Sequence, residues 1–145
     1  FNMELLAGVD DTLVEVREEG CRFRFDYARV YWNSRLQAEH TRLVDLMHKE
    51  TSTKEIGPIV IDAFCGVGPF VLPAAKRGCR VWANDLNPES VRWLRENLRL
   101  NRIETVKVFN QDAREFIRQM LTEEMPKFNL HANHLLMNLP AIAYQ

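Results

Sequence analysis

The chain has 145 residues, of which 46% are hydrophobic and 27% charged, and its formal net charge is −1 at pH 7. These values are typical of one soluble globular domain, and no apolar run approaches the roughly 18 residues of a membrane-spanning helix. Its three cysteines form no CxxC pair and no histidine stands at a metal-ligand spacing, which argues against a disulfide framework and a zinc site and favours a reducing compartment. The near-zero net charge also removes the strongest compositional indication of nucleic-acid binding.

A β-hairpin and a helix are predicted within residues 1–50. Residues 12–18 and 21–26 alternate between apolar and polar side chains on either side of Glu19-Gly20, the pattern of two strands joined by a tight turn. Between residues 35 and 47, apolar side chains recur at helical spacing, at Leu36, Leu43, Leu46 and Met47. We therefore expect a small hairpin and a helix that lead into the rest of the chain.

From residue 58 onward, strands alternate with helices. Residues 58–61 form a short apolar run typical of a strand covered on both faces, after a stretch at 51–57 that has no periodicity. The same reasoning predicts strands at 79–83, 106–109 and 134–137 and helices at 70–76, from residue 87, and at 113–121. Such alternation is typical of a parallel sheet with right-handed crossovers. We predict an α/β Rossmann-like core over residues 51–145, with four strands in the order 3-2-1-4.

Two glycines and an acidic residue predict a nucleotide-like site at the carboxyl edge of this sheet. Gly66 and Gly68 follow the first core strand, where residues without a Cβ allow a tight turn and close approach of a ligand. Asp85 ends the next strand, where a carboxylate can accept both hydroxyls of a ribose. Val71 replaces the third glycine of the GxGxxG pattern, and Pro69-Phe70 leaves little room for a pyrophosphate. The pattern favours adenosine without phosphates over NAD, with a simple strand-to-helix turn as the alternative.

Polar residues also follow the last two predicted strands. Asp112 comes after the third strand, where it can accept from the amine of adenine, cap the next helix, or do both. Asn138 and Pro140 come after the fourth, where the proline ends the strand and restrains the backbone. Because the carboxyl ends of parallel strands meet at one edge of a sheet, we expect these residues to face a single crevice.

These residues resemble motifs I to IV of class I S-adenosylmethionine-dependent methyltransferases, and longer stretches resemble the archaeal-eukaryotic tRNA guanine-N1 methyltransferases. The stretches that carry the narrower resemblance are 3–8, 25–36, 39–40, 64–70, 84–90 and 137–140. They cover nearly the whole chain, and Tyr31-Trp32-Asn33 combined with Asn138-Leu139-Pro140 is specific to that family. The resemblance implies methyl transfer from S-adenosyl-L-methionine to N1 of the guanosine 3′ of the anticodon. It also implies tRNA as partner, with no metal and no membrane.

The resemblance further implies roles for individual residues. Cofactor contacts are implied at His40, Gly66, Gly68, Asp85, Leu86, Asp112, Ala113 and Asn138. Glu39 matches the general base that removes the N1 proton, and we expect partial burial to raise its pKa. Arg35, one helical turn earlier, matches an arginine near the active site and is our candidate substrate-binding residue. Asn138 and Pro140 are expected to position cofactor and base.

Simpler interpretations stay open for several of these residues. Glu39 and Arg35 have the spacing of an exposed i,i+4 ion pair, and His40 would ordinarily be a surface residue. The four arginines within residues 92–102 fit a solvated helix face better than an RNA-facing stripe, because Glu89 and Glu96 lie among them.

Because the chain starts at Phe1 and ends at Gln145, we expect it to be part of a longer protein. Relative to the family pattern we expect a missing arginine, a missing tRNA-docking domain and missing last strands, so that the chain alone binds cofactor but transfers methyl groups at least about 10³-fold more slowly. The alternatives are a methyltransferase for another RNA or a protein, an NAD-dependent oxidoreductase, and a non-catalytic RNA-binding module. We expect a monomer in the cytoplasm, with mitochondrial or nuclear pools.

Overall fold

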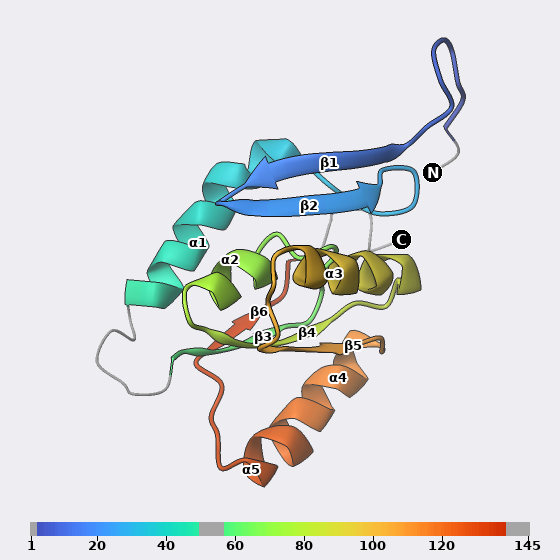
Figure 1. The fold of residues 1–145 in the computed structure, drawn as a ribbon. Helices are drawn as coiled ribbons and strands as arrows, with labels where there is room; N and C mark the ends of the chain where they lie inside the picture. Colours follow the sequence, from blue (N-terminus) through green and yellow to red (C-terminus); the bar gives the residue numbers. More distant parts are fainter. Residues whose placement is uncertain (1–2, 50–56, 139–145) are drawn as a thin grey trace.

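The computed structural model describes residues 3–49 and 57–138, which form four stacked layers (Figure 1). A hairpin of β1 (Leu13–Glu18) and β2 (Cys21–Asp26) lies over a layer of three helices. These helices are α1 (Gln37–Lys49), which follows a short 3-10 turn at Ser34–Leu36, α2 (Val71–Lys76) and α3 (Pro88–Leu100). The sheet lies beneath them, and α4 (Ala113–Gln119) and α5 (Met125–Lys127) cover its other face.

The sheet consists of four parallel strands in the order β5-β4-β3-β6. Their bounds are Ile59–Asp62 for β3, Arg80–Asn84 for β4, Val106–Phe109 for β5 and His134–Leu136 for β6. Every residue of β3 is buried because helices cover both faces of the sheet, which explains the apolar run at 58–61. The predicted order 3-2-1-4 and the α/β class are confirmed.

The helix predicted at 113–121 extends further than expected. After α4 the chain forms one π-helical segment, Met120–Glu124, and then continues as α5. Met120 and Met125, five residues apart, are both buried in the cluster that contains Trp82 and Phe116. The wider π turn brings both methionines to the same face, so packing rather than local propensity prolongs the helix.

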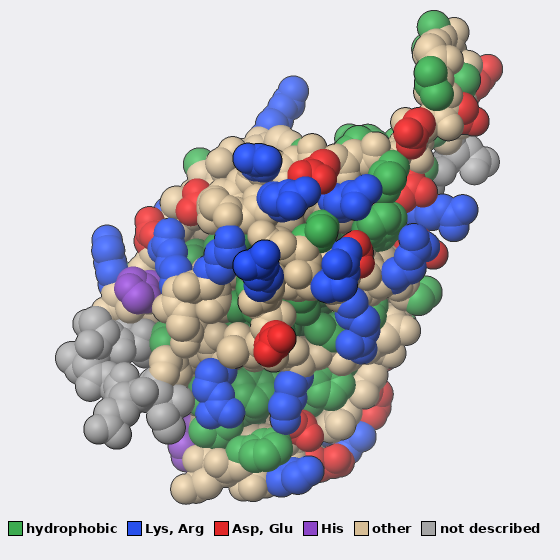
Figure 2. Space-filling view, in the orientation of Figure 1, with side chains coloured by type: hydrophobic (Ala, Val, Ile, Leu, Met, Phe, Trp, Pro, Cys, Tyr) green, Lys and Arg blue, Asp and Glu red, His purple; other side chains and the backbone are tan. Residues whose placement is uncertain are grey.

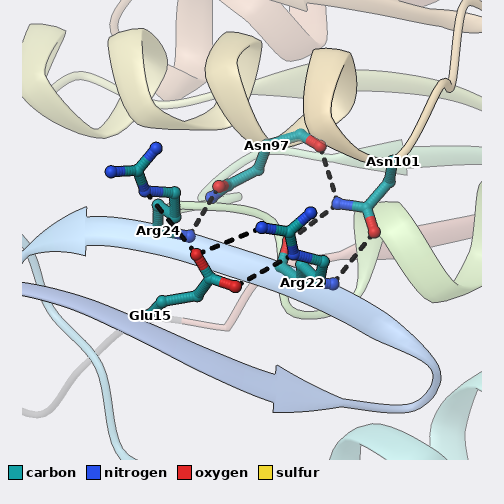
Figure 3. Close-up of polar contacts among 5 residues, drawn as sticks. All are labelled: Glu15, Arg22, Arg24, Asn97 and Asn101. Atoms are coloured by element: carbon teal, nitrogen blue, oxygen red, sulfur yellow. Dashed lines mark hydrogen bonds and ion pairs between the residues drawn. The ribbon is translucent and has the colours of Figure 1, made fainter.

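Two asparagines of α3 bind the hairpin to the core (Figure 3). The amide of Asn97 accepts from the backbone N–H of Arg24 at 2.7 Å, and Asn101 both accepts from the Arg22 N–H at 2.9 Å and donates to its carbonyl at 2.7 Å. Asn97 also donates to the carbonyl of Val67, within the glycine loop. The free edge of β2 therefore has hydrogen-bond partners, and the hairpin is linked through α3 to the loop after β3.

Candidate active site at the carboxyl edge of the sheet

A cavity of about 630 Å³ opens where β3 and β4 end. Three stretches of chain contribute most of its lining: the segment before and within the first turn of α1, the glycine loop, and the loop after β4. The lining residues are Tyr31, Trp32, Asn33, Leu36, His40, Phe64, Cys65, Gly66, Pro69, Phe70, Asp85, Leu86, Asn87, Ser90 and Asn138. Mostly apolar walls with a few polar groups are typical of a small-molecule site.

Asp85 connects the two loops that border this cavity. Its Oδ2 accepts from the Gly66 N–H at 2.9 Å and its Oδ1 accepts from the Asn87 N–H at 2.8 Å. Burial raises the pKa of the Asp85 carboxyl, against the effect of these two backbone donors. Each carboxylate oxygen has a second lone pair, so Asp85 can hold the loops and still accept from a ligand.

The two glycines have different structural roles. Gly66 has φ of +55° and lines the cavity, and a Cβ there would meet nothing within 4 Å, so the backbone conformation favours glycine. A Cβ on Gly68 would lie 2.5 Å from Leu72 Cδ1 and 2.7 Å from Leu94 Cδ1. Gly68 is buried and does not line the cavity, and both its φ of +105° and the close packing of the loop on α2 and α3 favour glycine there.

His40 is a buried residue of the cavity wall, and the simpler interpretation of it as a surface residue is wrong. The residue is 3% exposed, and its ring lies edge-on to Phe70, with ring centroids 4.7 Å apart. Its Nδ1 is 2.5 Å from Oε1 of Glu18, which is itself 4% exposed. Sequence reasoning did not single out Glu18, because alternation alone gives no reason for a carboxylate at the end of β1 to be buried.

Asn84 is a second polar residue that sequence reasoning missed. It is completely buried at the end of β4, donates to the carbonyls of Ala63 and Gln111, and accepts from the Gln111 N–H at 2.9 Å. These bonds join the ends of β3 and β5 across β4. The sequence signal that could have identified Asn84 is an asparagine at the last position of a mostly apolar strand.

Several predicted site residues lie outside the cavity lining. Asp112 is exposed and accepts from the Arg114 N–H as the N-cap of α4. This is the capping role that the sequence offered for Asp112 beside contact with adenine. Ala113 follows Asp112 and packs against the cluster that contains Trp82 and Phe116. Asn138 is exposed and contributes to the lining, whereas Pro140 lies outside the described residues.

The expectation that partial burial raises the pKa of Glu39 is wrong. Glu39 is exposed, and both of its carboxylate oxygens accept from the guanidinium of Arg42, at 2.7 and 2.8 Å. Hydrogen bonding to this cation lowers the pKa of Glu39. Glu39 therefore pairs with Arg42 at i+3 and not with Arg35.

Arg35 lies beside the cavity rather than in its wall. It lines an adjoining hollow of about 510 Å³ with Tyr27 and Ser34. This hollow and the cavity share Tyr31, Trp32 and Asn33, so a ligand that spans both would pass these three residues.

Arginines gather on the face formed by the hairpin and α3 (Figure 2). Arg92 pairs with Glu89 at 3.5 Å and Arg99 with Glu96 at 2.6 Å, while Glu15 accepts from Arg22. These pairs favour the solvated-face interpretation of the α3 arginines.

Other chemistries receive less support. Cys65 is a buried residue at the start of the glycine loop, and burial raises the pKa of its thiol well above the ordinary value, which favours a packing role over that of a nucleophile. Within residues 3–49 and 57–138, no three metal-binding side chains cluster closely enough to hold an ion. The same ranges contain no helix with the length and hydropathy needed to cross a membrane.

Comparison with known proteins gives one consistent family. A family model described as "TRM5/TYW2 methyltransferase domain" matches residues 14–145. The tRNA (guanine(37)-N(1))-methyltransferase of Danio rerio is 47% identical over 148 residues, which cover 100% of this chain and 29% of that relative. Methanocaldococcus jannaschii Trm5, solved in complex with adenosine, is 32% identical with a TM-score of 0.73, over 97% of this chain and 38% of that one. M. jannaschii TYW2, solved in complex with AdoMet, is 29% identical with a TM-score of 0.64, over 77% of this chain and 48% of that one.

The resemblance inferred from the sequence motifs is thereby confirmed. The family model spans the hairpin from Val14 through the last strand, so the match is not confined to the glycine loop that other nucleotide-binding folds share. This chain is matched along its whole length, and the match spans 29% of the Danio rerio relative. The chain therefore belongs to the TRM5/TYW2 methyltransferase domain family.

Proposed function

We propose that this chain is the cofactor-binding part of a tRNA methyltransferase that uses S-adenosyl-L-methionine to methylate N1 of guanosine 37, the nucleotide 3′ of the anticodon. The Danio rerio relative, 47% identical along the whole chain, carries this activity in its name. The TYW2 structure matches a smaller share of the chain, 77%, than the Trm5 structure does at 97%, which favours the guanine-N1 activity.

The single observation that carries the proposal is the position of Asp85 at the cavity. Its carboxylate holds the Gly66 turn and has lone pairs left for the two hydroxyls of a ribose. Its negative charge also suits a cofactor that carries a positively charged sulfonium. The cavity of about 630 Å³ lies within the range typical of small-molecule sites.

The wall next to Gly66 argues against a dinucleotide. Pro69 and Phe70 line the cavity directly before α2, at the place where a pyrophosphate would approach the helix in a nicotinamide enzyme. These apolar side chains offer no hydrogen-bond donor to a phosphate. A nucleoside that carries an amino acid in place of phosphates suits this wall better.

Bound S-adenosylmethionine supplies an electrophilic methyl group, and the protein must place guanine N1 in line with it and accept the N1 proton. Glu39 is the proposed base. In the described arrangement the ion pair with Arg42 lowers its pKa, so this pair must open before Glu39 can accept a proton. Arg35 and Asn138, beside the cavity and in its lining, are the proposed contacts that orient the guanine and the cofactor.

Titration calorimetry with the full-length protein tests the proposed cofactor site. S-adenosylmethionine should bind, NADH should not, and Asp85→Ala should weaken S-adenosylmethionine binding by about 1 to 3 kcal/mol because a buried acceptor of the ribose hydroxyls is lost. Asp45→Ala is the matched control, since it removes an acidic partner of Arg77 that lies away from the cavity. Binding of NADH, or equal affinity of the Asp85→Ala variant and the wild type, would contradict the assignment.

A further inference from the structure

The buried pair of Glu18 and His40 lies at the junction of the hairpin, α1 and the cavity. Glu18 is the last residue of β1, and His40 lies in the first turn of α1. Both side chains are almost fully buried, and His40 Nδ1 is 2.5 Å from Glu18 Oε1. Burying an ionisable pair is costly and often contributes no net stability, so its presence in a cavity wall calls for a reason other than stability.

The surroundings of His40 restrain its ring in two further ways. Phe70 contacts the ring edge-on with 4.7 Å between centroids, and Trp32 approaches it at 6.5 Å with an interplanar angle of 62°. Both aromatic residues also line the cavity. With the ring restrained by these contacts, donation from Nδ1–H to the Glu18 carboxylate would favour the tautomer that carries its proton on Nδ1.

This bond determines what His40 offers to a ligand. When Nδ1–H donates to the Glu18 carboxylate, Nε2 of the neutral ring is a hydrogen-bond acceptor. S-adenosylmethionine carries donors of the matching kind in its ammonium, its ribose hydroxyls and its adenine amine. Without Glu18 the ring could carry its proton on Nε2 and present a donor to these groups instead.

We propose that Glu18 is a positioning residue of the cofactor site, which holds His40 in the Nδ1-protonated form so that Nε2 accepts from the bound cofactor. This inference rests on the proposed cofactor. It gives the hairpin an indirect role in cofactor binding through His40, although the hairpin lies on the helical layer and apart from the sheet (Figure 1).

The neighbouring residue Glu19 provides a matched control. Glu19 accepts from Thr41 Oγ1 of α1 at 2.5 Å and pairs with Arg77 at 3.5 Å, so it fastens the same turn of the hairpin to the same helical layer. Its described contacts do not include His40. A variant of Glu19 therefore loosens the turn without removing the partner of the imidazole.

The experiment combines calorimetry and nitrogen NMR on the full-length protein. In the wild type, histidine-labelled NMR should show His40 protonated at Nδ1 and unprotonated at Nε2, and S-adenosylmethionine should bind. Glu18→Ala should weaken that binding by about 10-fold or more and move the proton to Nε2. Glu18→Gln keeps an oxygen that accepts from Nδ1–H, so it should retain the Nδ1–H signal and restore affinity to within about 3-fold of the wild type. Glu19→Ala should leave both the affinity and the signal unchanged.

Each outcome separates this inference from the proposed function. If the wild type does not bind S-adenosylmethionine, the proposed cofactor is wrong. If the wild type binds but His40 is unprotonated at Nδ1 or protonated at Nε2, or if a folded Glu18→Ala variant binds equally well, Glu18 does not position the ring as proposed. If Glu18→Ala fails to fold, the wild-type NMR signal and the Glu18→Gln variant test the inference. A Glu18→Gln variant that loses the Nδ1–H signal and keeps full affinity for S-adenosylmethionine overturns it.

Discussion

Two adjacent side chains at the end of β4 hold the loops around the cavity. Asp85 accepts from Gly66 and Asn87, while Asn84 bonds to Ala63 and to Gln111. The position of Asp85 at the end of the second core strand was predictable from the strand pattern, but its bonds to the Gly66 and Asn87 N–H groups were not. The role of Asn84 was not predictable either, because its partners come from two other loops that meet only in the folded sheet.

Glu39 shows the limit of reasoning from a motif. Its position in the chain matches a proposed base, but sequence spacing does not say which of the nearby arginines it pairs with. Arg42 pairs with it, and the pKa of Glu39 is lowered instead of raised. The same limit applies to His40, whose buried partner, Glu18, is distant in the sequence.

We expect Glu39→Gln in the full-length protein to lower single-turnover methyl transfer to tRNA by about 10²-fold or more and to leave cofactor affinity intact. Arg42→Ala removes the cation that lowers the Glu39 pKa, so that pKa should rise. The acidic limb of the pH–rate profile should then move to higher pH, because Glu39 is inactive as a base when protonated. A normal rate in Glu39→Gln would mean that another group accepts the proton. An unmoved limb in Arg42→Ala would mean that Arg42 does not set the pKa of Glu39 during the reaction.

Asp62 gives a prediction for stability against pH. It is fully buried at the end of β3, and burial raises the pKa of its carboxyl to about 7. The folded protein therefore retains this proton up to about pH 7, whereas the unfolded chain releases it near the ordinary value of about 4. The contribution of Asp62 to the free energy of unfolding is greatest below pH 4 and declines as the pH rises to 7, by at most about 4 kcal/mol.

Asp62→Asn mimics the protonated carboxyl and cannot ionise. Urea unfolding of both proteins between pH 4 and 7 should show the variant gaining stability relative to the wild type as the pH rises. Asp45→Asn should not show this trend, because pairing with Arg77 lowers the pKa of that carboxyl. A stability difference between Asp62→Asn and wild type that is constant with pH would mean that Asp62 is ionised in the folded protein.

At the scale of elements, α3 joins the hairpin to the cofactor loop. Its buried Asn97 bonds to Arg24 of β2 and to Val67 of the glycine loop, whereas Asn101, one turn later, is partly exposed and bonds to Arg22 (Figure 3). The amphipathic pattern predicted this helix and its start at Asn87-Pro88. This pattern could not predict that the hairpin packs on the helix, because no local signal indicates which strand edge the asparagines will hydrogen-bond.

We expect Asn97→Ala to lower the free energy of unfolding by about 1 to 3 kcal/mol, since it leaves the Arg24 N–H and the Val67 carbonyl without their partner in a buried place. Asn101→Ala should cost less, because water can reach the groups that it leaves. Denaturant unfolding of the two variants of the full-length protein makes the comparison, and an equal or larger loss in Asn101→Ala would show that burial does not govern this contact.

At the scale of the whole molecule, the sequence pattern was sufficient for the sheet and its order. Apolar runs, glycine turns and helix caps are local signals, and right-handed crossovers leave few arrangements for four parallel strands. The packing of the hairpin over α1, α2 and α3 was not predictable, because it depends on contacts between segments far apart in the chain. The cavity lies where the local signals converge, which is why Gly66, Asp85 and Asn138 could be anticipated and Glu18 could not.

The most direct test of the central claim is mass spectrometry of tRNA from cells that lack the full-length protein. Our account predicts that 1-methylguanosine at position 37 is lost, that the wild-type gene restores it, and that a gene encoding Asp85→Ala restores much less of it at comparable protein abundance. Unchanged 1-methylguanosine at position 37 in the cells without the protein, or full restoration by the Asp85→Ala variant, would contradict it.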